Sequence, residues 1–246
     1  MKGLRRHAVF VGRVVVPLVL LASWSLAAAL SDLVAPVGAS VSAVLSGFAD
    51  GSLWPDVSDT LRSVLAGFAV AVVLGVPFGV WVGRNPYLYR VLESVFSGTA
   101  AVPRIVLLPV LLTLFGITIQ AKIGMAFLGA IVPVALTTMA GTRTVRPALL
   151  KLGRSLSMSR RVTLLKVIVP SALASIMSGL RIGFSLSLLT VVLSEFFAAV
   201  HGVGLRIQQA YSSQDLPLMY GLVALVIIFG LVANIAIWLI ERRTVE

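Results

Sequence analysis

Three charged side chains fall within or beside long apolar stretches of the sequence. They are Arg104, Arg181 and Glu195. A charge at membrane depth is costly, so such a residue usually faces a cavity, pairs with another charge or serves function. In one interpretation, Arg104 and Glu195 interact and, with Arg181, are candidates for lining a polar path. In the other, each side chain reaches headgroups or water and only orients its helix, as Arg181 can do by extending from the start of its segment.

The residue combinations that hydrolytic or metal chemistry needs do not occur. The chain has no cysteine, and its two histidines, His7 and His201, are far apart in the sequence. This excludes the paired histidines and thiolates of common metal sites. No glycine-rich loop ends in Gly-Lys-Ser/Thr, so the chain does not hydrolyse ATP through a P-loop. We therefore predict a protein that is not an enzyme and binds no metal or cofactor itself.

The composition predicts an all-α membrane protein. Of the 246 residues, 59% are hydrophobic and 12% are charged, whereas a soluble domain carries about 25% charged residues. A chain of this length has too little interior to bury so much apolar surface. A spanning helix needs about 20 mostly apolar residues, and six segments qualify. They are residues 9–30, 61–83, 94–115, 121–141, 176–198 and 218–240, of which the third is interrupted by Pro103, Arg104 and Pro109.

The basic residues predict the orientation of these spans. The net charge of +11 comes mostly from Lys and Arg beside the apolar segments, which argues against nucleic-acid binding. With the N-terminus in the cytoplasm, most basic residues lie on the cytoplasmic side, as the positive-inside rule requires. We therefore predict a multi-pass cell-membrane protein with both termini in the cytoplasm. The outside segments then hold Arg62, Lys122 and Arg206 with Asp32, Asp50, Asp56, Asp59 and Asp215, whose carboxylates we expect to be solvated.

Small residues recur in the second apolar segment. Gly75, Gly79 and Gly83 follow one another at a spacing of four. Such a row lets two spanning helices approach closely. The alternative is that it reflects only the ordinary glycine content of membrane helices.

The longest cytoplasmic segment, about residues 142–175, is too polar to span and too apolar for a free linker. Ser157 and Ser159 interrupt it, Ser159 is suited to cap a second short helix, and Pro170 is expected to end that helix. We predict two short amphipathic helices, which in the alternative interpretation merely rest on headgroups. The apolar residues at helical spacing are Leu149, Leu152 and Leu156, followed by Leu164, Leu165 and Ile168.

Several short motifs occur in an order that is specific in combination. They are Pro103 followed by a basic residue, Leu107-Leu108-Pro109, Phe115-Gly116, Leu156-Ser157-Met158-Ser159, Val167-Ile168-Val169-Pro170, Gly179-Leu180-Arg181, Ser194-Glu195-Phe196, Gly202-Val203-Gly204 with Ile207, and the closing run Leu239-Ile240-Glu241-Arg242-Arg243. In this order they resemble the permease subunit of ATP-binding-cassette (ABC) importers, and more narrowly the nitrate/sulfonate/taurine type. The resemblance covers nearly the whole chain beyond the first apolar segment.

The resemblance implies a type I ABC importer fold formed by residues 1–246 as a single permease domain. It also implies an assembly of two permease copies in a homodimer, two cytoplasmic ATPase subunits that bind ATP and Mg, and an extracytoplasmic solute-binding protein. Its solutes are small organic or inorganic anions such as a sulfonate, taurine or nitrate, or vitamin precursors. Residues 146–170 would be the coupling segment that sits in a groove of the ATPase. The coupling residues would be Lys151, Leu152, Gly153, Leu156, Ser157, Met158 and Ser159.

This coupling motif departs from the family pattern. Members of the family begin it with Glu-Ala-Ala and place a glycine six residues after the Glu. Here Lys151 replaces the acidic residue and Ser157 replaces the turn glycine. Serine still favours a turn. The reversed charge is either matched by a changed ATPase partner, or the coupling rests on shape and apolar contact.

Two other classes of function fit the sequence less well. An ion- or proton-coupled carrier usually carries inverted repeats with interrupted helices at matching positions, and no such repeat is found. An intramembrane enzyme needs a nucleophile with a base, or a set of metal ligands, at membrane depth, and the sequence offers neither.

Overall fold

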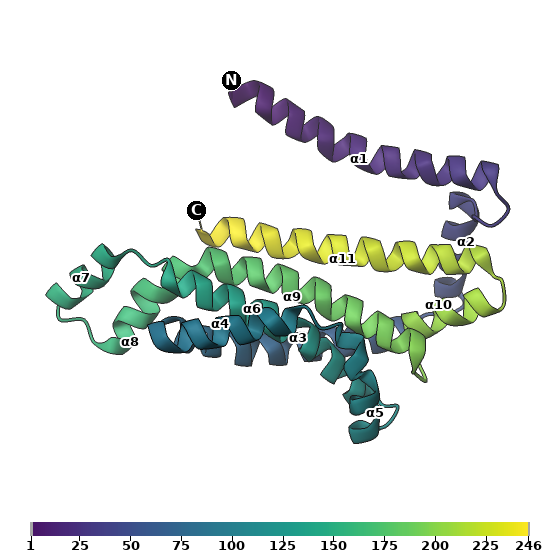
Figure 1. The fold of residues 1–246 in the computed structure, drawn as a ribbon. Coiled ribbons are helices and arrows are strands. Elements are labelled where there is room, and N and C mark those ends of the chain that lie inside the picture. The colour runs from purple at the N-terminus through teal and green to yellow at the C-terminus, as the bar shows by residue number, and fades with distance from the viewer. Residues whose placement is uncertain (1, 246) are drawn as a thin grey trace. The chain divides into compact units, whose positions relative to one another are not determined.

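The computed structural model describes the backbone of residues 2–245 and the side chains of residues 15–243. All regular elements in this part of the chain are helices, which confirms the all-α class (Figure 1). They are α1 (Lys2–Leu30), α2 (Val37–Ala49), α3 (Trp54–Gly83), α4 (Pro86–Ala100), η1 (Arg104–Leu107), α5 (Leu108–Phe115), α6 (Ile119–Arg143), α7 (Pro147–Ser155), α8 (Arg160–Thr163), η2 (Leu164–Ile168), α9 (Val169–Phe197), α10 (Val203–Ser212) and α11 (Leu216–Val245).

The long apolar helices match four of the predicted spans. Within the described residues, Trp54–Gly83, Ile119–Arg143, Arg160–Phe197 and Leu216–Arg243 are long and apolar enough to cross a membrane. The first predicted span lies in α1, whose apolar residues 15–30 are described. The N-terminal basic residues of that prediction, up to Arg13, lie outside the described side chains.

The third predicted span, residues 94–115, is broken more sharply than the interrupted helix that was expected. Helix α4 ends at Ala100, and the η1–α5 pair that follows is bent from it by 90°. Proline lacks a backbone N–H and disfavours helical geometry in the residue before it. Pro103 begins the break, and Pro109 occupies the first turn of α5. The segment is therefore a broken span or a re-entrant loop rather than one interrupted helix.

The prediction that Pro170 ends a helix is wrong, because one helix runs from Arg160 to Phe197. The turn before the proline, Leu164–Ile168, is a π-helix, in which the Val169 N–H bonds to the carbonyl of Leu164. In a regular α-helix the Pro170 ring would clash with the carbonyl four residues earlier. A π-turn widens the backbone at that point, so the helix passes the proline without ending.

The chain divides into two compact units. One unit comprises Asp56–Leu205 and the residues from Ile228 onward, and it holds both predicted sites. Within it, α3, α6 and α9 lie side by side (Figure 1). A Cβ at Gly79 would lie 2.6 Å from the Cβ of Thr138, and one at Gly83 would lie 2.6 Å from the carbonyl oxygen of Met139. The close approach predicted from the glycine spacing is therefore confirmed.

Helices α6 and α9 are also tied by hydroxyl groups. Ser187 Oγ donates to the carbonyl oxygen of Ala126 at 2.7 Å, and Thr190 Oγ1 donates to that of Met125 at 3.0 Å. Both hydroxyls are buried, and a buried hydroxyl without a partner would be destabilising. These bonds fix the register of the two helices that carry the charged residues described below.

The other unit comprises the residues before Asp56 together with Arg206–Ile227. Trp24 Nε1 donates to the carbonyl oxygen of Ala35 at 2.9 Å, and the Tyr220 hydroxyl donates to that of Leu33 at 3.3 Å. The first bond ties the turn after α1 back to α1, and the second ties that turn to the start of α11. Helices α2 and α10, of 13 and 10 residues, were not predicted from the sequence, because they are too short to register as spans.

Candidate functional site

A cluster of charged residues is buried where α3 and α6 begin and α9 ends. Glu195, two residues before the end of α9, is fully buried, and Lys122 in the first turn of α6 is 6% exposed. Asp59 and Thr60 come from the second turn of α3. Buried charges are tolerated when they are paired and hydrogen-bonded, so the partners of each group decide what the cluster does.

Lys122 has an acceptor for each of its three N–H groups. Its Nζ donates to the carboxylate of Asp59, to Oε1 of Glu195 at 3.1 Å and to the carbonyl oxygen of His201 at 2.9 Å. An ammonium group donates three hydrogen bonds and accepts none, so this one is fully satisfied. Among the described side chains, no group of three or more His, Cys, Asp or Glu residues could hold a metal ion.

Glu195 is held by α3 and by the loop that follows α9. Thr60 Oγ1 lies 2.8 Å from Oε2 of Glu195, and the Gly204 N–H donates to the same oxygen at 3.1 Å. Thr60 Oγ1 also accepts the Val203 N–H at 2.9 Å. The carboxylate therefore joins three separate segments of the chain.

The two glycines of the loop are required by its geometry. Gly202 has φ +135°, a conformation that L residues rarely adopt, and its N–H donates to Oδ1 of Asp56 at 2.9 Å. A Cβ at Gly202 would overlap the Glu195 carboxylate, and one at Gly204 would overlap the carbonyl oxygen of Val192. The Gly202-Val203-Gly204 motif thus lets the backbone reach the buried acid.

The cluster differs from the predicted pairing. Glu195 is at its centre, but its cationic partner is Lys122 rather than Arg104, whose Nε donates to the carbonyl oxygen of Leu128 at 2.8 Å. The expectation that Asp56 and Asp59 are solvated is also wrong, since Asp56 is 7% exposed and Asp59 pairs with Lys122. Lys122 could have been identified as a candidate partner from the sequence, because it stands at the start of an apolar helix, where a charge needs a partner.

Arg181 lies in a different place, on the face of α9 near the last turns of α11. Its guanidinium pairs with Glu241 at 3.2 Å, instead of only extending toward headgroups. Arg181 also lines a hollow of about 350 Å³ together with Ser178, Ser185 and Asn234. Asn234 Nδ2 donates to Ser185 Oγ at 2.9 Å. Ile182 and Leu186 complete the lining, so the hollow is mainly apolar and carries a few polar groups.

Helix α7 forms as predicted, whereas the second predicted helix is not separate, because α8 is the first turn of the helix that runs from Arg160 to Phe197. Helix α7 ends in a Schellman motif, in which the Met158 N–H bonds to the carbonyl of Gly153 and the Ser157 N–H to that of Arg154. Such an ending places one residue in the left-handed region, usually glycine. Here that residue is Ser157, with φ +50°. Ser159 caps α8 as predicted, accepting the Val162 N–H at 3.3 Å.

Helix α7 has two different faces. Gly153 is buried beside Met158 and Thr163. A leucine stripe consisting of Leu149, Leu152 and Leu156, the last of these at the C-cap of the helix, is 39%, 55% and 64% exposed. Figure 1 shows α7 and α8 beyond the ends of α4, α6 and α9. The stripe is therefore exposed on a helix that lies beyond the helical bundle of its own unit, and Lys151 is exposed as well.

Comparison with known proteins places these features in a family. Residues 75–246 match the model of the binding-protein-dependent transport system inner membrane component. The chain belongs to this family. It is similar to the taurine transport system permease protein TauC of Escherichia coli (strain K12), with 30% identity over 80% of this chain and 72% of that protein. It is also similar to the nitrate import permease protein NrtB of Leptolyngbya laminosa, with 28% identity over 81% and 71%.

The fold agrees with this assignment. A chain of the MetNI methionine ABC transporter in an inward-facing conformation aligns with a TM-score of 0.66 and 21% identity, over 79% of this chain and 94% of that one. The protein is thus the membrane-spanning permease subunit of an ABC importer. In this family ATP is hydrolysed by a separate ATPase subunit, and the permease has no cofactor of its own.

Proposed function

We propose that this permease imports a small anion of the sulfonate, taurine or nitrate class, or else a vitamin precursor. The similarity to permeases named for taurine and nitrate supports the anion. Residues 1–246 act as one permease domain in a homodimer with both termini in the cytoplasm. The homodimer works with two ATPase subunits that bind ATP and Mg and with an extracytoplasmic solute-binding protein.

The exposed leucine stripe of α7 is the observation that carries the coupling part of this proposal. Leu152 and Leu156 are more than half exposed on a short helix outside the bundle. Clustered apolar side chains on a surface facing water usually mark an interaction site. Residues 146–170 therefore form the coupling segment, with the stripe and Lys151 against the ATPase. Gly153, Met158 and the turn at Ser157 fix its angle.

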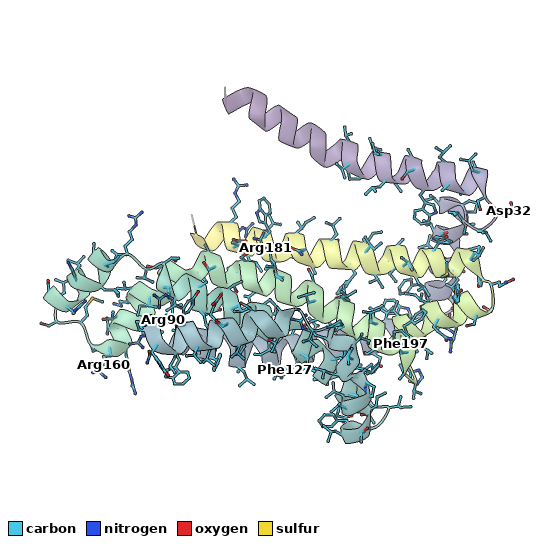
Figure 2. All side chains as sticks on the ribbon, viewed as in Figure 1. Asp32, Arg90, Phe127, Arg160, Arg181 and Phe197 are labelled. Carbon is cyan, nitrogen blue, oxygen red and sulfur yellow. The ribbon has the colours of Figure 1, made fainter. Side chains whose placement is uncertain are left out.

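The continuous helix from Arg160 to Phe197 connects this segment to the buried cluster. It has 38 residues, which at 1.5 Å per residue is about 57 Å. Figure 2 shows Arg160 and Phe197 at its opposite ends. At its far end Glu195 is tied to α3 and α6 through Thr60 and Lys122. ATP binding closes the ATPases and displaces the coupling segment. The long helix transmits this displacement to the ends of α3, α6 and α9 around Glu195, which move as one group. The permease thereby shifts between inward-open and outward-open states.

The three path candidates have different roles in this scheme. Glu195 is enclosed by its partners, so it joins helices at the outer end of the path rather than touching solute. Arg104 fixes the broken helix to α6 through Leu128. Arg181 lines the hollow, where a cation and hydroxyl groups suit an anion, and Glu241 balances its charge when no solute is present.

Uptake by the reconstituted complex tests the coupling proposal. Leu152→Gln places an amide in the leucine stripe. Leu165→Gln is the matched control, because Leu165 is 67% exposed in the same segment but lies outside the stripe. We expect ATP-driven uptake into proteoliposomes to fall about tenfold for Leu152→Gln and to persist for Leu165→Gln. A tenfold fall corresponds to the loss of about 1.4 kcal/mol of the free energy with which the stripe docks on the ATPase. Equal uptake by the two variants would refute the role of the stripe.

A further inference from the structure

A basic cavity lies on the inner side of the coupling segment. It has a volume of about 510 Å³ and is bounded by α7, α8 and the adjoining ends of α3 and α6. Volumes of this size accommodate small ligands. Figure 2 shows Arg160 at the end of the bundle where this cavity lies. Four arginines line it, namely Arg84, Arg143, Arg154 and Arg160, and none of its described lining residues is acidic.

The positive charge of this cavity is not neutralised within the described part of the chain. No carboxylate there lies within ion-pair distance of any of the four guanidinium groups. Arg143 stacks at 4.6 Å over the ring of Tyr89, which orients the side chain and leaves its charge in place. A concave surface lined by one sign of charge concentrates the field and attracts a counter-ion.

The floor of the cavity is apolar. Val145 and Ile168 line it and are 7% and 6% exposed, and Met158 contributes its thioether. The cavity therefore combines guanidinium groups at the rim with hydrocarbon below them. A free inorganic anion uses only the rim, whereas an amphipathic anion uses both parts.

We propose that this cavity binds the phosphodiester of an anionic phospholipid headgroup. Guanidinium groups bind phosphate oxygens in pairs of parallel hydrogen bonds. The cavity stands at the ends of spanning helices, and basic pockets between such helices bind anionic headgroups. Arg154 from α7 and Arg160 from α8 flank the turn at residues 156–159. One headgroup held between them and Arg84 and Arg143 ties the turn to the ends of α3 and α6.

Retention of lipid by the purified full-length permease tests the site. Arg143→Gln with Arg160→Gln removes two rim charges. The matched control, Arg146→Gln with Arg161→Gln, removes two neighbouring charges that do not line the cavity. Protein in mixed micelles with phosphatidylglycerol or phosphatidylcholine is washed, and bound lipid is counted by native mass spectrometry. We expect the wild type and the control variant to retain phosphatidylglycerol in preference to phosphatidylcholine. The cavity pair, Arg143→Gln with Arg160→Gln, should bind phosphatidylglycerol about tenfold more weakly.

Four outcomes would overturn the proposal. Equal retention of phosphatidylcholine would show that the headgroup charge is not recognised, and an equal loss in the control pair would show general electrostatic attraction. If inorganic phosphate binds with the same dependence on Arg143 and Arg160 and lipid does not, the ligand is a free anion. If the cavity pair changes only the affinity for the ATPase, the occupant is an acidic side chain of that partner. The leucine stripe and its uptake assay do not enter this experiment.

Discussion

The ion pair between Lys122 and Glu195 provides the sharpest test of the buried cluster. Lys122→Met removes the ammonium and leaves the fully buried Glu195 carboxylate with the Thr60 hydroxyl and the Gly204 N–H. Removing one partner of a buried pair costs about 3–5 kcal/mol, since the other charge remains uncompensated. Glu195→Gln keeps the shape of the side chain and leaves Lys122 its bonds to Asp59 and His201. We therefore expect a smaller loss of about 1–3 kcal/mol.

A double-mutant cycle separates the pair from its surroundings. Each variant and the double variant are unfolded reversibly in mixed micelles, and the free energy of unfolding is compared with wild type. Residues in one hydrogen-bonded network show coupling energies of about 0.5–3 kcal/mol, and the double variant should lose less than the sum of the single losses. Glu195→Gln should also impair ATP-driven uptake, because it weakens the tie between α9, α3 and α6.

Arg181 and Glu241 provide the comparison pair for this cycle. Their side chains are 28% and 18% exposed, and a partly exposed pair contributes up to about 1 kcal/mol. We expect Arg181→Met with Glu241→Gln to give the smaller coupling. A coupling near zero between Lys122 and Glu195, together with unchanged uptake by Glu195→Gln, would refute the structural role of the cluster.

Three further variants or measurements test other parts of the structure. Ser157→Gly should stabilise the permease by about 0.5–1 kcal/mol, since glycine tolerates a positive φ. A bulky residue at Ser157 or Gly153 should instead uncouple uptake from ATP hydrolysis without preventing membrane insertion. Normal uptake by these bulky variants would argue against the coupling role. Gly204→Ala should cost about 1–3 kcal/mol because its Cβ would lie 2.8 Å from that of Glu195, and Gly38→Ala, with open space around it, is the control whose unfolding should change little. The purified chain alone should show no ATPase activity, and hydrolysis at the rate of a full complex would contradict its assignment as a permease subunit.

The sequence predicted the long spans well because their signal is local. About 20 consecutive apolar residues suffice to identify a spanning helix, and α3, α6, α9 and α11 carry that signal. The breaks were not predictable in the same way. Pro170 was expected to end a helix, and the π-turn at Leu164–Ile168 lets the helix continue. Pro103 was expected to interrupt a span, and the chain turns by 90° instead. The effect of a proline depends on how its neighbours satisfy the freed carbonyls.

The candidate site was predicted only in part. Glu195 stood out because a charge in an apolar segment needs a partner. Its partner Lys122 is 73 residues away, and their meeting depends on the register of α6 against α9, which Ser187 and Thr190 set. The spacing of residues along the sequence does not predict that register. At Ser157, by contrast, the substitution of serine for the family's glycine identified the turn, and the structure gives that residue φ +50°.

We propose that this permease takes energy from a partner ATPase through residues 146–170. The most direct measurement is uptake of taurine and nitrate into proteoliposomes that contain the permease, its ATPase subunits and its solute-binding protein. We predict uptake of at least one of these anions that requires ATP and the binding protein and falls about tenfold in Leu152→Gln. Uptake driven by an ion gradient without ATP or the ATPase would contradict the account.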